Sequence, residues 1–225
     1  MLIVNFILIV IVLLIAIGLI FWRFYLEPKI TMFDDEKRVK NFHSMDQVFP
    51  SKIIRCATQA YIFQEDLCDL NTSYQFQGET RTMVDFLQRT GNTGILILRD
   101  DLIIYEKYSQ GYTKFDKKTS WSVAKGFISA LVGIAINEGY IQNINDPITQ
   151  YMPELKESGY NNVPIKHILQ MSSGIKFSEA YEDKNSDINQ LLYKLFLYMR
   201  PIEKVIFNYP SQFPSGNYFE YVSLN

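Results

Sequence analysis

The sequence predicts an α+β fold in which a β-hairpin is followed by a helical domain, the whole preceded by one transmembrane helix. Three observations support this prediction. Residues 2–22 are apolar apart from Asn5, residues 94–108 hold two β-rich runs around a short acidic turn, and apolar residues beyond Ser122 recur at helical spacing.

The composition is that of a folded chain without an obvious charged partner. Of its 225 residues, 48% are apolar and 15% are aromatic, which is ample for a packed core. The formal net charge is −2 and no long basic run occurs, so nucleic acid is not an expected partner. His43 and His167 are the only histidines, and no Cys/His cluster has metal-ligand spacing, so we expect no metal site. Cys56 and Cys68 are compatible with one disulfide or with two free thiols.

Residues 2–22 are predicted to be an uncleaved membrane anchor. The stretch carries no charge, and its length matches the ~20 residues that cross a bilayer. A cleaved signal peptide usually has a basic start, a shorter apolar region and a small-residue cleavage site, and the stretch lacks this pattern. Arg23 and Lys29 follow it, and by the positive-inside rule they would leave the rest of the chain in the cytoplasm.

Residues 23–90 are predicted to be a linker and N-terminal segment, largely loop or spacer. Within it, Glu79–Leu87 has the apolar spacing of a short helix. After it, Gly94–Leu98 and Leu102–Tyr108 flank an Arg-Asp-Asp turn and predict a β-hairpin.

The candidate chemistry lies at the start of the most apolar helical segment beyond the anchor. Ser122 and Lys125 are about one helical turn apart, so the hydroxyl and the amine can converge on one point. A serine becomes an effective nucleophile when a neighbouring base takes its proton, and burial lowers the pKa of a lysine toward that role. The run 126–136 is apolar on nearly every face, as in a fully buried helix, and Thr119 or Ser120 is its candidate N-cap. Spacing alone equally fits an N-terminal helix serine beside a solvated lysine.

A second serine has the same spacing from a lysine. Ser173 precedes Lys176 by three positions, but Gly174 follows it directly. That pattern predicts a helix C-terminus with the glycine in the left-handed conformation, so Ser173 is expected to belong to a turn. Helices are predicted from about residue 164 to 171 and from 188 to 201, where Pro201 ends the second.

Several motifs occur together in one order along the second half of the chain. They are the hairpin, Trp121-Ser-Val-Ala-Lys125, Asp146-Pro147, His167-Ile-Leu-Gln-Met-Ser-Ser-Gly174 and Phe219-Glu-Tyr-Val-Ser223. In content and order they resemble the β-lactamase-related serine hydrolases, whose β-lactamase/penicillin-binding-protein-like fold is then expected here in part. Within that superfamily the chain is most similar to the class C-type esterases and the 6-aminohexanoate-dimer (nylon oligomer) hydrolase branch, from about residue 90 to the end.

The resemblance implies acyl transfer to and from a serine, with no metal or organic cofactor. The family's nucleophile, helix lysine and Tyr-x-[Asn/Ser] tyrosine fall on Ser122, Lys125 and Tyr221. Ser122 would attack the carbonyl of an amide or ester, Lys125 and Tyr221 would move protons, and water would release the acyl-enzyme. The Ser122 backbone amide would supply part of an oxyanion hole.

Three tyrosines fit the Tyr-x-[Asn/Ser] spacing, so spacing does not choose among them. Tyr160 and Tyr209 match it as well as Tyr221 does. Tyr221 is preferred because it follows a Pro-Ser-Gly turn and a Phe-Glu pair, as in the family's pattern. Tyr181, in a polar loop, matches the place of a substrate-side tyrosine in the nylon-oligomer branch, although exposed loop tyrosines are common.

The sequence departs from the family at its end. The family's third motif, K-T-G or a variant, lies well beyond the tyrosine motif, whereas this chain stops two residues after Ser223. Residues 91–225 are therefore expected to be the N-terminal part of a β-lactamase-related domain, truncated before its C-terminal half. That half would supply one wall of the site, a second oxyanion amide and strands to pair with the hairpin, whose edge would otherwise be exposed.

Two functions follow from different classes of protein. The first is a serine hydrolase of amides or esters that residues 2–22 anchor in the lipid bilayer. The second half of its catalytic domain would belong to the same polypeptide or to a separately encoded chain. The second is a catalytically inactive remnant or binding module. Members of the family usually act outside the cytoplasmic membrane, so we expect a single-pass inner-membrane protein with its domain on the periplasmic or outer face, against the charge signal of Arg23 and Lys29.

Overall fold

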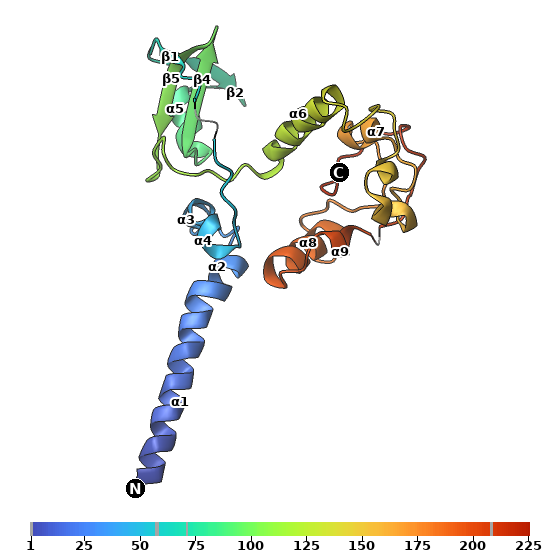
Figure 1. Ribbon diagram of the computed structural model, residues 1–225. Helices are drawn as coiled ribbons and strands as arrows, with labels where there is room; N and C mark the ends of the chain where they lie inside the picture. Colours follow the sequence, from blue (N-terminus) through green and yellow to red (C-terminus); the bar gives the residue numbers. More distant parts are fainter. Residues whose placement is uncertain (1, 57–58, 71, 208) are drawn as a thin grey trace. The chain divides into compact units, whose positions relative to one another are not determined.

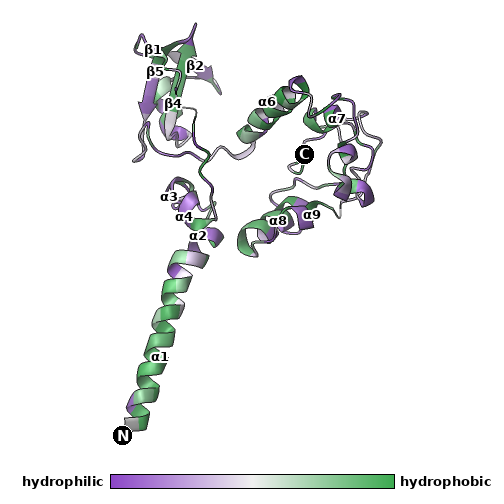
Figure 2. Cartoon of the chain, in the orientation of Figure 1, coloured by the Kyte–Doolittle hydropathy of each residue, from purple (hydrophilic) through white to green (hydrophobic). Residues whose placement is uncertain are grey.

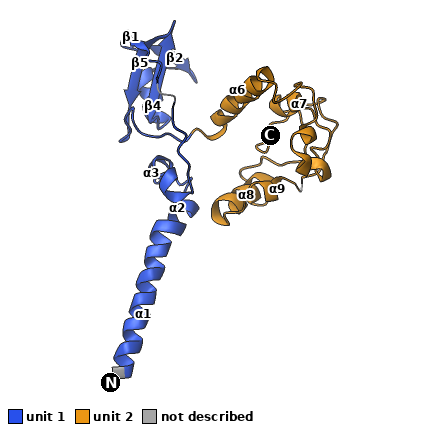
Figure 3. Ribbon diagram, viewed as in Figure 1, with its two compact units in different colours: residues 1–119 blue, residues 120–225 orange. Residues whose placement is uncertain are grey.

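The computed structural model describes residues 2–56, 59–70, 72–207 and 209–225, which fold as two compact units. Unit 1 covers residues 1–119 and unit 2 covers residues 120–225, as Figure 3 shows in two colours. Strands lie in unit 1, and the helices from the candidate active-site helix onward lie in unit 2 (Figure 1). The predicted α+β class, with a hairpin ahead of a helical region, is confirmed.

An apolar helix opens unit 1. Helix α1, Leu2–Phe21, continues through a π-helical turn, Trp22–Leu26, into helix α2, Glu27–Ile30. Figure 2 shows that α1 is apolar around its circumference. The run Ile3–Ile30 holds 28 residues, and its apolar part is long enough to cross a membrane. This length and composition, at the N-terminus, fit a membrane span and a signal sequence equally.

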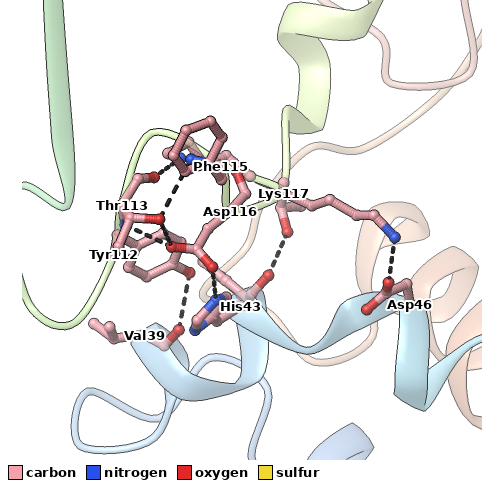
Figure 4. Close-up of polar contacts among 11 residues, drawn as sticks. Val39, His43, Asp46, Tyr112, Thr113, Phe115, Asp116 and Lys117 are labelled. Carbon is pink, nitrogen blue, oxygen red and sulfur yellow. Dashed lines mark hydrogen bonds and ion pairs between the residues drawn. The ribbon is translucent and has the colours of Figure 1, made fainter. Parts of the chain in front are cut away.

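Two short helices follow and are tied to the loop that ends unit 1. These are α3, Arg38–His43, and α4, Met45–Val48. His43 Nε2 lies 2.9 Å from Asp116 Oδ1, and Lys117 Nζ lies 2.7 Å from Asp46 Oδ2; both pairs are joined by dashed lines in Figure 4. Hydrogen bonds from Thr113 and then from His43 lower the pKa of the Asp116 carboxyl to about 2. The segment predicted to be mostly spacer is therefore partly helical and bonded to residues more than seventy positions later.

A small hairpin and a capped helix fill the rest of that segment. Strand β2, Ser73–Phe76, pairs antiparallel with β3, Glu79–Thr82, and helix α5 spans Met83–Arg89. The predicted helix 79–87 is wrong in its first four residues, because Thr82 forms a capping box with Asp85. The Asp85 amide donates to Thr82 Oγ1 at 3.1 Å, and the Thr82 amide donates to Asp85 Oδ2 at 3.0 Å, so the helix begins after Thr82.

The predicted hairpin forms with nearly the predicted bounds. Strand β4, Gly94–Arg99, pairs antiparallel with β5, Leu102–Tyr108, across a two-residue turn. Asp100 and Asp101 both have positive φ, as a type I′ hairpin turn requires. The expectation that the hairpin edge is left exposed is wrong for β5, because β1, Gln64–Glu65, pairs parallel with it and gives the order β1-β5-β4.

Unit 2 surrounds one apolar core. Its elements are a 3₁₀ turn Trp121–Val123, α6 Ala124–Asn137, 3₁₀ turns Ile148–Gln150 and Pro153–Glu157, α7 Ile165–Leu169, α8 Asp187–Leu192, a π-helical turn Tyr193–Leu197, and α9 Glu203–Ile206. The core joins side chains from 155 to 222: Leu155, Tyr160, Ile175, Phe177, Ile188, Leu191, Val205, Tyr209 and Val222. Since Val222 belongs to it, the end of the chain is fixed to the body of the unit.

Helix α6 is not the fully buried helix that its composition predicts. None of its residues is buried by the described residues, and Phe127, Ile128, Leu131 and Ile134 are each more than half exposed. Figure 2 shows the apolar character of this helix. The apolar pattern predicts that another surface covers the helix, and the other described residues of unit 2 do not supply that surface.

Gly174 has the predicted left-handed conformation but does not end the helix, because α7 ends at Leu169 and the left-handed residue that follows it is Met171, with φ +53°. Gly174 has φ +77°, and the Gly174 carbonyl accepts hydrogen bonds from the amides of Gln212 at 2.8 Å and Phe213 at 3.1 Å. Ser173 is 2% exposed, in agreement with a structural place in the turn. The turn thus joins the loop after α7 to the segment that leads toward Tyr221.

Replacing Gly174 with alanine is expected to destabilise unit 2 by more than the roughly 1–2 kcal/mol that left-handed backbone costs an L-residue. A Cβ at this position would lie 2.2 Å from the Phe213 carbonyl oxygen, so the backbone would have to move as well. The measurement is the free energy of unfolding from denaturant titration followed by circular dichroism. Gly139→Ala is the matched control, since Gly139 has φ +80° but open space at its Cβ, and equal losses in the two variants would contradict the prediction.

Candidate active site

Ser122 lies in a tight turn just before helix α6. The 3₁₀ turn Trp121–Val123 leads directly into the helix, and Trp121 has φ +43°, a left-handed conformation that is rare for a bulky residue. Ser122 is exposed. The predicted N-cap role of Thr119 or Ser120 is wrong, because the chain enters α6 through this turn and neither the turn nor the helix has a side-chain cap. Strained backbone of this kind is often found beside functional groups.

Tyr221 is held against Ser122 by the chain around it. The Glu220 amide donates to the Met171 carbonyl at 2.8 Å, and Val222, on the other side of the tyrosine, is 1% exposed in the core. The Tyr221 hydroxyl then lies 2.7 Å from Ser122 Oγ, within hydrogen-bonding distance, although the two residues are 99 positions apart. The structure therefore brings together the serine and the tyrosine that the sequence selected.

Lys125 reaches the same segment from helix α6. Its side chain is partly buried, and its Nζ donates to the main-chain oxygens of Ser223 at 2.9 Å and Asn225 at 2.5 Å. Burial lowers the pKa of Lys125 below its ordinary value, and the negative charge of Glu179 opposes that shift. Among the described residues, the hydrogen bonds found for the Lys125 amine go to these carbonyl oxygens, and the one found for Ser122 Oγ comes from Tyr221.

The two other tyrosines with the motif spacing are part of the core. Tyr160 is 4% exposed, and its hydroxyl donates to Asn225 Oδ1 at 3.0 Å. Tyr209 packs edge-on against Phe177, with ring centroids 5.2 Å apart. Burial raises the pKa of both phenols. Geometry thus distinguishes Tyr221 from residues with identical local spacing.

Tyr181 and Glu179 lie in the loop before α8, next to the same segment. The Tyr181 side chain is exposed, and burial of its hydroxyl, with the charge of Glu179, raises its pKa. Glu179 accepts a hydrogen bond from the Ser223 amide, so it contacts the residue that binds Lys125. Sequence reasoning missed Glu179, because a single glutamate in a polar loop matches no spacing pattern.

Nothing in the described ranges suggests a metal centre. No group of three or more His, Cys, Asp or Glu side chains gathers there. His167 Nδ1 lies 3.1 Å from Ser215 Oγ, and the ring packs over Gly216, which gives it a structural contact in the turn rather than one with Ser122. Cys56 and Cys68 are both exposed free thiols.

Comparison with known proteins identifies the family of the chain. Residues 81–225, well over half of the chain, match the protein family described as Beta-lactamase. The chain belongs to the Beta-lactamase family. A curated relative of this Beta-lactamase-family chain, the 6-aminohexanoate-dimer hydrolase of Paenarthrobacter ureafaciens, is 32% identical to it over 102 residues, which are 45% of this chain and 26% of the relative.

A solved structure shares the fold of this Beta-lactamase-family chain. It comes from Bacillus anthracis, is provisionally named a 6-aminohexanoate-dimer hydrolase, and superposes with a TM-score of 0.68 at 19% identity. The match covers 84% of this chain and 52% of the solved chain. The predicted β-lactamase-like fold and the resemblance to this branch are confirmed. The chain spans no more than about half the length of these two relatives.

Proposed function

We propose that this chain is a serine hydrolase that acts on an amide or ester through an acyl-enzyme, with Ser122 as nucleophile. The observation that carries the proposal is the 2.7 Å contact between the Tyr221 hydroxyl and Ser122 Oγ, beside a lysine whose pKa burial lowers. The Paenarthrobacter ureafaciens relative is named as a hydrolase of the 6-aminohexanoate dimer, which supports amides as one substrate class.

Each of the three residues has a distinct part in the proposed chemistry. The Ser122 proton passes to Tyr221 in its phenolate form, or to neutral Lys125, as Oγ attacks the substrate carbonyl, and the protonated group then returns that proton to the leaving amine or alcohol. The Ser122 amide donates to the oxyanion, and water then attacks the ester that links the acyl group to Ser122. Tyr181, exposed beside the site, is assigned to the substrate side.

Covalent labelling tests the proposal. A fluorophosphonate is expected to form an adduct on the peptide that contains Ser122 in the full chain held in detergent micelles. Turnover of a panel of p-nitrophenyl esters and short linear amides then identifies the preferred acyl group.

The exposed face of α6 supports a second candidate, a non-catalytic remnant or binding module. This apolar helix needs cover, and the relatives are at least about twice as long as the part of them that this chain matches. In the hydrolase proposal, that cover and the second oxyanion donor come from further polypeptide of the same fold, in this protein or in a separately encoded chain. The nucleotide sequence downstream of the Asn225 codon discriminates: an encoded K-T-G-like strand supports the hydrolase, and its absence there and in neighbouring genes supports the remnant.

Helix α1 is proposed to anchor the protein in the cytoplasmic membrane as a single pass. Residues 2–22 would lie in the bilayer, with the catalytic domain on the periplasmic or outer face. The support is the length and apolar surface of the helix, together with the absence of charge over those positions.

Thiol labelling is expected to show on which side of the membrane the catalytic domain lies. Cys56 and Cys68 are exposed, so an impermeant maleimide added to intact cells should label both if the domain lies outside the membrane. Cys56→Ser with Cys68→Ser is the background control. Labelling that appears only after the cells are lysed would place the domain in the cytoplasm, as the charges of Arg23 and Lys29 suggest.

A further inference from the structure

Glu179 makes a contact at the candidate active site that the proposed chemistry has not used. Its Oε1 accepts a hydrogen bond from the Ser223 amide. Its Oε2 is buried, with no hydrogen-bond partner among the described residues. Burying a carboxylate oxygen without a hydrogen-bond partner costs free energy of folding. Such a group is therefore expected where its charge or its position has a function.

The Ser223 peptide links Glu179 to Lys125. The amide side of Ser223 donates to Glu179, and the Ser223 carbonyl accepts from Lys125 Nζ at 2.9 Å. Tyr221 is two residues earlier in the same segment, with its hydroxyl 2.7 Å from Ser122 Oγ. A carboxylate that holds Ser223 therefore fixes the carbonyl that orients the lysine and the backbone that carries the tyrosine.

The charge of Glu179 acts on the same lysine. Burial lowers the pKa of Lys125, and Glu179 raises it. The titratable groups that interact with this carboxylate are Lys125 and Tyr181, and Tyr181 in turn interacts with Tyr221. Removal of the negative charge would leave burial unopposed, so Lys125 would lose its proton at lower pH.

We propose that Glu179 is a positioning residue of this hydrolase: through the Ser223 peptide it sets the place of Lys125 and Tyr221 at the site of Ser122, and its negative charge acts on the Lys125 amine. The catalytic part of this inference rests on the proposed hydrolase function. Glu179 does not touch Ser122, and it acts through Ser223 and through its charge.

Two substitutions separate the hydrogen bond from the charge. Glu179→Gln keeps an oxygen that can accept from the Ser223 amide but removes the charge. Its fluorophosphonate labelling rate is expected to stay within about threefold of wild type at high pH, with the acidic limb of the pH profile moved to lower pH. Glu179→Ala removes both, and we expect at least a tenfold slower rate at every pH, since small misplacements of catalytic groups cost about 10²-fold. Glu182→Gln, an exposed carboxylate in the same loop, is the matched control and should leave rate and profile unchanged.

Chemical modification of Lys125 tests the same inference without a measurement of enzyme activity. Reductive methylation of Lys125 in the full chain, followed by peptide mass spectrometry from pH 7 to 10, reports when its amine becomes neutral. In Glu179→Gln this profile should move to lower pH, and in Glu182→Gln it should not move. Wild-type protein that fails to label with fluorophosphonate defeats the proposed function, and the methylation profile then still decides the role of Glu179. An unchanged profile in Glu179→Gln, together with wild-type labelling in Glu179→Ala, would overturn the inference.

Discussion

Ser122→Ala is expected to lower fluorophosphonate labelling and ester turnover by at least about 10³-fold, because removal of a serine nucleophile leaves only binding and oxyanion contributions. The substitution removes one exposed hydroxyl and its contact with Tyr221, so the fold of unit 2 should be kept. Labelling is measured by fluorescence after gel separation, and the adduct is located by peptide mass spectrometry. Unchanged circular dichroism would show that the loss comes from chemistry.

Ser173→Ala is the matched control for that prediction. Ser173 has the same spacing from a lysine as Ser122, but it is 2% exposed, and its Oγ lacks a hydrogen-bond partner among the described residues. Its removal should leave labelling within about twofold and cost little stability, since no hydrogen bond is lost. If wild type and Ser122→Ala label to the same low level, the remnant is supported. If Ser173→Ala abolishes the adduct, the assignment of the nucleophile is wrong.

The sequence predicted the elements with strong local patterns. The apolar stretch 2–22, the hairpin and the left-handed Gly174 were predicted because their signals are local: a run without charged residues, two β-rich runs around adjacent aspartates, and a glycine in a Ser-Ser-Gly sequence. Short helices at 38–48 were missed, since their support comes from His43 and Asp46 bonding to residues 116 and 117. Hydrogen bonds and ion pairs between residues far apart in the chain produce no periodic pattern in the sequence.

The site shows the same division between local and long-range information. Ser122 with Lys125 is a local spacing, but it occurs twice, and three tyrosines share the second motif. The order of motifs selected Tyr221, and the structure gives a physical reason in agreement: Val222 is fixed in the core, which sets the tyrosine toward Ser122. Glu179 has no local signal at all. Its place at the site depends on a hydrogen bond to Ser223, 44 positions later.

Helix α6 shows what composition predicts and what it leaves open. An apolar surface on every side predicts burial, yet the described residues leave Phe127 and Leu131 more than half exposed. Hydrophobic pattern is a property of the helix alone, whereas burial requires a second surface. For the proposed hydrolase, the polypeptide that covers α6 is the same one that would complete the wall beside Ser122, so stability and activity are expected to rise together when it is supplied.

Tyr221→Phe is expected to lower kcat for ester hydrolysis by about 10²–10⁴-fold, the range for loss of a general acid–base group. The substitution keeps the ring and removes only the hydroxyl that lies 2.7 Å from Ser122 Oγ. KM should change little, because the hydroxyl acts on the serine proton and not on the bound substrate. The measurement is steady-state turnover of the best p-nitrophenyl ester, with fluorophosphonate labelling as a check on the first step alone.

Tyr218→Phe is the control, because Tyr218 is exposed and its ring packs against Phe213 with centroids 5.1 Å apart. The Tyr218→Phe variant should keep turnover within about twofold of wild type. A loss of turnover seen only in Tyr221→Phe would then be due to the Tyr221 hydroxyl. If Tyr221→Phe labels and turns over like wild type, Lys125 alone serves as base and the tyrosine merely donates a structural hydrogen bond to Ser122. If it labels slowly but hydrolyses a preformed acyl-enzyme at the normal rate, the Tyr221 hydroxyl acts in acylation, and the water that releases the acyl group is activated by Lys125.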